Sequence, residues 1–108
     1  MANNYKFKGV ALATTDQTNI VTAATGETLI IRSINITNNT ANTPTVTLDV
    51  TDTSASASYQ ILRTHGLTAN TSEELITEPL VLEAGDILKA TMDATDSVHI
   101  TLSYLAIT

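Results

Sequence analysis

The sequence predicts an all-β protein, an antiparallel two-sheet sandwich with jelly-roll or Greek-key-like connections and about eight strands. Roughly one residue in five is threonine, and Thr, Val and Ile pack well on a pleated surface. Apolar and polar residues alternate with a period of two along several runs. Gly, Asn, Asp and Ser gather between these runs, where such a fold needs turns.

The predicted strands follow one another at intervals of about ten residues. They cover residues 5–13, 19–23, 29–38, 45–51, 59–64, 74–77, 88–92 and 98–106. The clearest are 45–51, where Val46 and Leu48 alternate with threonines, and 98–106, where Leu102 and Tyr104 share the apolar face. Both patterns are typical of a sheet with one face in water.

The strand predicted at residues 29–38 changes parity along its length. Residues 29–31 are three apolar side chains in a row, after which Ile34 and Ile36 continue in the even register. Because side chains alternate strictly along a strand, this change needs an explanation. The pattern predicts either a bulge near Arg32 and Ser33 or a stretch that is buried on both faces.

Length and composition predict one globular domain, residues 1–108. Apolar residues make up 43% of the chain and charged residues 15%, which favours a packed core over a disordered chain. The chain has no cysteine, which excludes disulfides, thiolate zinc sites and cysteine nucleophiles.

Charge and hydropathy exclude several classes of partner. Eleven acidic residues outnumber five basic ones, so the chain lacks the cations that phosphate contacts require, and the same sign disfavours an anionic membrane surface. It has no apolar stretch long enough to cross a bilayer, and its N-terminus does not resemble a secretory signal. We therefore expect no nucleic-acid or membrane partner, and synthesis in a host cytoplasm.

No residue pattern points to catalysis, a cofactor or a metal. His65 and His99 lack a spaced partner and are predicted to lie at the surface or an interface. Acidic pairs in loops, such as Glu83 and Asp86, could hold calcium, but they lack its loop pattern, and Gly85 favours a tight turn there. Few aromatic residues are present for a glycosidase. We expect a non-enzyme without cofactor.

Three segments resemble small β-sandwich virion proteins of tailed bacteriophages. Residues 79–90 are similar to a hairpin in which alternating leucines precede Gly85 and Asp86, and residues 98–107 to a final strand that ends on Ser-Tyr-Leu. Residues 29–39 followed by 45–50 are similar to a central hairpin. The resemblance implies a structural part of a virion, such as a head decoration, neck or tail-associated protein, without an active site.

The predicted function is therefore that of a capsid decoration or cement protein, located in the virion. Such a protein binds other virion proteins, here the major capsid protein, and forms a homo-oligomer; because it binds only the assembled lattice, it stabilises that lattice. The alternatives are a neck, collar or tail-attached protein, and a host-surface glycan-binding module using Tyr59 and residues 38–42. The predicted interface consists of four apolar residues that are expected to point away from the core: Leu29, Ile31, Leu105 and Ile107.

Overall fold

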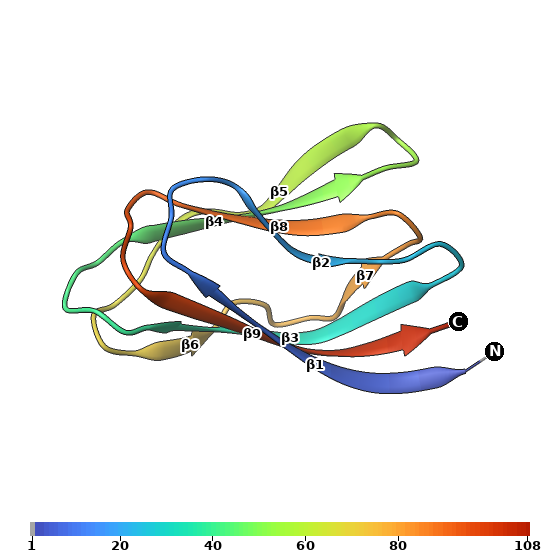
Figure 1. Ribbon diagram of the computed structural model, residues 1–108, viewed down its shortest axis with the longest axis horizontal. Helices are drawn as coiled ribbons and strands as arrows, with labels where there is room; N and C mark the ends of the chain where they lie inside the picture. Colours follow the sequence, from blue (N-terminus) through green and yellow to red (C-terminus); the bar gives the residue numbers. More distant parts are fainter. Residues whose placement is uncertain (1) are drawn as a thin grey trace.

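The structure is a computed structural model that describes residues 2–108, and it consists of nine antiparallel strands in two facing sheets (Figure 1). The described residues contain no helix, so no helix among them could cross a lipid bilayer. The strands are β1 (Asn3–Leu12), β2 (Thr18–Thr22), β3 (Thr28–Asn38), β4 (Thr45–Asp52), β5 (Ala57–Gly66), β6 (Ser72–Glu74), β7 (Leu80–Leu82), β8 (Ile87–Met92) and β9 (Val98–Ile107). The predicted fold class is confirmed.

The strand order is that of a jelly roll. One sheet has the order β1-β9-β3-β6, with β7 also paired to β3, and the other has the order β2-β8-β4-β5. The first four strands thus pair with the later ones in reverse order, like one long hairpin rolled into two layers. Since β6 and β7 lie along the same strand β3, they act as one interrupted strand, in keeping with the predicted eight.

The two segments interpreted as hairpins are crossovers between the sheets. Strand β7 pairs with β3 in the first sheet, whereas β8 lies in the second sheet between β2 and β4. In the same way β3 and β4 belong to different sheets. The turn residues between them do reverse the chain, but the strand that follows enters the opposite sheet instead of hydrogen-bonding to its predecessor. The hairpin interpretation was wrong in both places.

A β-bulge at Arg32 resolves the parity change in β3. The register between β3 and β9 shifts between Ile31 and Ser33, so that one extra residue is accommodated. As a result Ile31 and Ile34 both face the opposite sheet, and both are fully buried. Of the two readings of this segment, the bulge is confirmed.

One hydrophobic core lies between the sheets, built from the alternating faces of both. Its largest fully buried side chains are Ile20, Leu29, Ile31, Ile34, Ile36, Leu48, Leu82, Leu88, Ile100 and Leu102. The opposite faces of β4 and β8 are half exposed, and that of β4 is rich in threonine. The outer face of the first sheet differs, because large apolar side chains lie on it.

Candidate interaction surface

Four apolar side chains form a continuous row across the outer face of the first sheet. Tyr5 on β1 pairs with Leu105 on β9, Leu105 pairs with Ile30 on β3, and Ile30 pairs with Val81 on β7. Directly opposed residues in a sheet point to the same side, so the four side chains lie next to one another. We call them the outer apolar row.

The ends of the outer apolar row are its most exposed members. Tyr5 retains 78% of its accessible surface and Val81 54%, while Leu105 and Ile30 are half-buried on the central strands. Each contacts solvent instead of the core, because its chain neighbours, such as Ala106 beside Leu105, face inward. Apolar groups aligned in this way on a soluble domain indicate a contact surface for another molecule.

Uncharged side chains of β1 and β9 flank the outer apolar row on both sides. One neighbouring row aligns Ile107 with Asn3 and Thr28. The other aligns Phe7, which is 69% exposed, with Ser103. The apolar surface therefore extends from the row to Ile107 in one direction and to Phe7 in the other.

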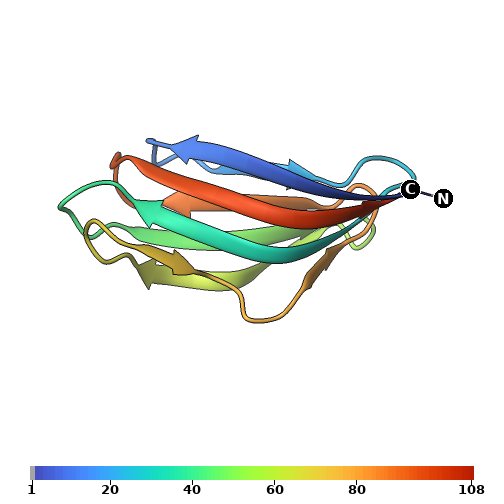
Figure 2. The ribbon, with the colours of Figure 1, turned by 90° about the horizontal axis from the view of Figure 1, so that it is seen from below.

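The surface lies towards the end of the molecule where the two chain termini meet. Ala2 and Thr108 exchange backbone hydrogen bonds of 3.1 and 2.9 Å, which continue the pairing of β1 with β9 to the last residue. Figure 2 shows β1, β9 and β3 side by side, with both termini at the same end. Tyr5 and Leu105 are thus held on paired strands, not on mobile tails.

Two of the four predicted interface residues do not belong to this surface. Leu29 and Ile31 are 1% and 0% exposed, and they pack in the core. Ile30, between them, faces outward instead. The parity of the run could not be assigned from the sequence, because the bulge at Arg32 decides which residues of β3 point inward. Leu105 and Ile107 do lie on the outer face, half-buried, opposite the core-facing Ala106.

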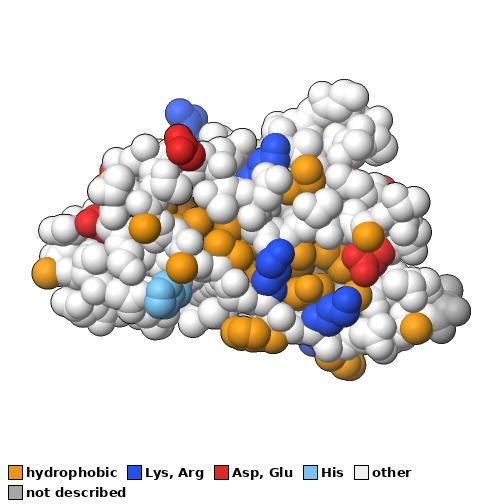
Figure 3. Space-filling view, in the orientation of Figure 1, with side chains coloured by type: hydrophobic (Ala, Val, Ile, Leu, Met, Phe, Trp, Pro, Cys, Tyr) orange, Lys and Arg blue, Asp and Glu red, His pale blue; other side chains and the backbone are white. Residues whose placement is uncertain are grey.

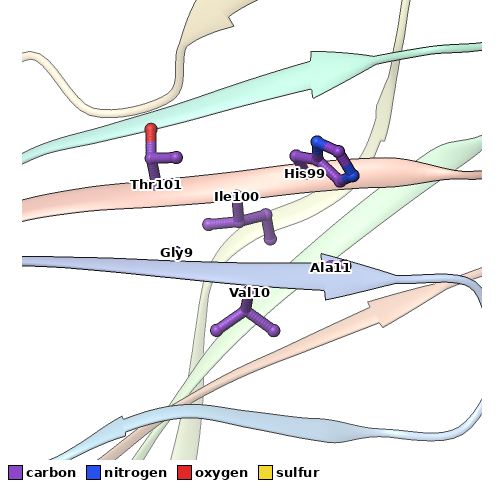
Figure 4. A pocket seen from close by; sticks show the side chains of 6 residues that line it. All are labelled: Gly9, Val10, Ala11, His99, Ile100 and Thr101. Atoms are coloured by element: carbon purple, nitrogen blue, oxygen red, sulfur yellow. The ribbon is translucent and has the colours of Figure 1, made fainter.

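A shallow hollow of about 280 Å³ lies farther along the same two strands. It is lined by Gly9, Val10 and Ala11 of β1 and the opposed residues 99–101 of β9. In Figure 4, His99 and Thr101 project to one side of β9 and Ile100 to the other. The hollow is open and mostly apolar, so it extends the interaction surface without resembling an enclosed ligand site.

Acidic side chains in the loops accept hydrogen bonds from backbone N–H groups of the turns. Both Asp86 carboxylate oxygens accept backbone N–H groups, from Thr53 at 3.2 Å and from Glu83 at 3.0 Å. Asp93 accepts the backbone N–H of Thr45 at 2.8 Å. Within residues 2–108, no three or more His, Asp or Glu side chains gather in a way that could hold a metal ion.

The histidines differ in their surroundings. His99 is exposed on the outer face of β9, as the alternation predicts. The residue types at His65 and Gly66 predict a turn, but His65 lies in β5, and its Nε2 is 2.9 Å from Glu73 Oε1 on β6. Because β5 and β6 belong to different sheets, this pair links the two layers. The sequence could not indicate it, since the contact depends on how the sheets stack.

The residues considered for glycan binding are not brought together. Tyr59 pairs with Val50 near the turn that joins β4 to β5. Residues 38–42 precede β4 at its other end, where Thr45 pairs with Gly66. Asn38 is buried and organises its own loop, so it is not available to a sugar.

No protein-family model matches the sequence, and no curated protein matches it. The functional argument therefore depends on the surface of this chain itself.

Proposed function

We propose that the protein is a non-catalytic structural component of a tailed-phage virion, namely a capsid decoration protein that binds the assembled shell. The observation that carries this proposal is the outer apolar row, which leaves Tyr5 and Val81 largely exposed on an ordered sheet. The jelly-roll fold suits it, because this fold recurs in virus particles, although fold alone does not specify function.

The proposed mechanism is binding linked to assembly. A flat sheet face with aligned apolar residues can bury its surface against a neighbouring protein that presents a matching flat surface. If the matching surface exists only on correctly assembled capsid subunits, binding of the protein shifts the equilibrium towards the assembled capsid by mass action. No cofactor or chemical step is needed, and the half-exposed outer faces of β4 and β8 in the second sheet would remain in water.

Position in the particle is the direct test. Particles from the phage that carries this sequence are purified, and peptides of the chain are quantified by mass spectrometry against the major capsid protein. A decoration protein is expected at a copy number comparable to the number of capsid subunits or capsomers. A few copies per particle would favour the neck, collar or tail alternative, and absence from the particle would overturn the proposal.

The role of the outer apolar row is tested with paired variants. The double variant Tyr5→Ser, Val81→Ser removes its two exposed ends, and Tyr59→Ser, Ile61→Ser removes a similar exposed pair from β5 on the other sheet. We expect both variants to fold, and only the first to lose binding to particles stripped of the protein. Equal binding by the two variants would exclude this surface from the interface.

A further inference from the structure

Strand β1 has a free edge and carries a local positive charge on an acidic protein. It is the last strand of its sheet and pairs only with β9. Its first seven residues are exposed. Lys6 and Lys8 are two of the five cations of the chain, and the first acidic residue is Asp16.

The two faces of β1 have opposite chemistry. Tyr5 and Phe7 lie on the outer face, in the apolar surface described above. Lys6 and Lys8 lie on the other face, since they pair with Tyr104 and Leu102, which point towards the core. Among residues 2–108, no Lys or Arg forms a salt bridge, and the one contact of that kind joins His65 to Glu73. Both ammonium groups therefore lack a carboxylate partner among these residues.

The second sheet does not cover this end of β1. On the inward face of β1, side chains are exposed at Lys6 and Lys8, half-buried at Val10 and buried at Leu12. The gap between the sheets thus opens towards the N-terminal half of β1. Figure 3 shows apolar atoms at the surface between the two layers, with Lys and Arg side chains over them. An additional strand beside β1 would cover this opening.

We propose that the free edge of β1 binds an extended segment of a partner protein in which acidic and apolar residues alternate. Such a segment would add a strand to the sheet through main-chain hydrogen bonds, with specificity from its alternate side chains. Its acidic residues would lie beside Lys6 and Lys8, and its apolar residues beside Tyr5 and Phe7, in either strand direction. Opposite charges placed directly across a sheet attract.

A second copy of this chain fits the edge less well. Paired edge to edge through β1, two copies would bring their Lys6 and Lys8 side chains onto one face of a continuous sheet, where like charges repel. Lysines that point inward on an edge strand are a known means of preventing such pairing. The same lysines attract a strand of opposite charge, and this selects the partner.

The test uses a capped synthetic peptide, about as long as β1, in which Val and Glu alternate. A second peptide replaces each Glu by Lys, and a third carries N-methyl groups that remove the main-chain donors. Fluorescence anisotropy with the full chain is expected to detect binding of the Val-Glu peptide only. Failure of that peptide to bind, or equal binding of the Val-Lys or N-methylated peptide, would overturn the proposal.

Charge reversal locates the site. The double variant Lys6→Glu, Lys8→Glu should bind the Val-Glu peptide with roughly tenfold lower affinity. It should also bind the Val-Lys peptide, which the original chain does not bind. The control variant Arg63→Glu with Lys89→Glu has the same net charge, but its changes lie in β5 and β8 of the other sheet, so it should behave like the original chain. Equal weakening in both variants would show only long-range electrostatics and would overturn the assignment to β1.

Two further results separate this inference from its alternatives. Self-association that is detected by light scattering and abolished by the β1 reversal would make a second copy the occupant, and would contradict the inference. The inference does not depend on the virion assignment: peptide binding is measured on the isolated chain, whereas the proposed function is judged by presence in purified particles.

Discussion

At the scale of single residues, one position along β3 separates a core side chain from a surface one. Ile31 is fully buried against the opposite sheet, while its neighbour Ile30 points outward in the outer apolar row. The two residues have the same side chain and lie on the same strand. Their different roles arise from alternation along β3, with the phase set by the bulge at Arg32.

Alanine substitution should measure this difference directly. Ile31→Ala leaves a cavity in a packed core and should lower the free energy of unfolding by about 2–5 kcal/mol. Ile30→Ala removes a half-exposed side chain and should cost roughly 1 kcal/mol. Urea denaturation followed by circular dichroism measures both values. Similar losses in the two variants would contradict the observed direction of these side chains.

Asn38 is the buried polar residue on which a loop depends. It is 2% exposed. Its side-chain amide donates to the carbonyls of Asn42 at 2.8 Å and Thr68 at 3.3 Å. Its side-chain oxygen Oδ1 accepts hydrogen bonds from the backbone N–H of Thr40 at 3.0 Å and from the Thr40 hydroxyl at 2.8 Å. The polar segment after β3 is therefore an organised loop.

Removing this amide should be costly although little apolar surface is lost. We expect Asn38→Ala to lower the free energy of unfolding by about 2–4 kcal/mol, because four part-buried hydrogen bonds are lost together. The exposed neighbour provides the control, since Asn39→Ala should change stability by less than about 0.5 kcal/mol. Thermal unfolding of the two variants in parallel gives the comparison, and an unaffected Asn38→Ala variant would refute it.

At the scale of elements, the turn between β7 and β8 depends on Gly85. Its φ angle is +89°, in the left-handed region. Its backbone N–H donates to Ala23 at 2.8 Å, and its carbonyl accepts the Thr53 hydroxyl at 2.6 Å. One turn thus connects segments from three different parts of the chain, where the strand crosses from one sheet to the other.

Two glycines allow a matched test of that turn. Gly85→Ala forces a side chain into the left-handed region, with its Cβ at 3.4 Å from Thr53 Cβ; we expect a loss of about 1–2 kcal/mol. Gly66 has no positive φ and open space around its Cβ position, so Gly66→Ala should be neutral or slightly stabilising. Chemical denaturation distinguishes these outcomes, and equal stability of the two variants would argue against the turn conformation.

At the scale of the whole molecule, the two layers are joined mainly by their apolar faces. The pair of His65 and Glu73 adds a polar link at the margin, with side chains 35% and 37% exposed. Partly exposed pairs of this kind contribute little individually because water competes for both groups. The sandwich should therefore depend on its core and only slightly on this contact.

A double-mutant cycle measures the coupling energy between His65 and Glu73. His65→Ala, Glu73→Ala and the double variant should give a coupling energy of about 0.2–1 kcal/mol. Unfolding free energies at a fixed pH and salt concentration supply the four corners of the cycle. A coupling of several kcal/mol would mean that this contact, and not the core, determines how the sheets are held together.

The sequence by itself was sufficient for most of the strands and for the need for a bulge. It did not predict β7 as a strand, and its strand at residues 74–77 overlaps β6 at one residue only. Val46, Leu48 and Leu102 all face the core as their alternation predicts, because periodicity within one strand reports the direction of its own side chains. Near Arg32 the same pattern indicated that the alternation of inward and outward side chains is interrupted, but it did not indicate which residues face inward.

The tertiary structure alone decided which strands pair and which stack. A Gly-Asp turn reverses the chain whether the next strand joins the same sheet or the opposite one, so the crossover from β7 to β8 has no local signal. The outer apolar row depends on the same choice, because Tyr5 and Leu105 are neighbours only once the first and last strands pair. Such distant pairings are set by burial of the whole core, which no short stretch of sequence specifies.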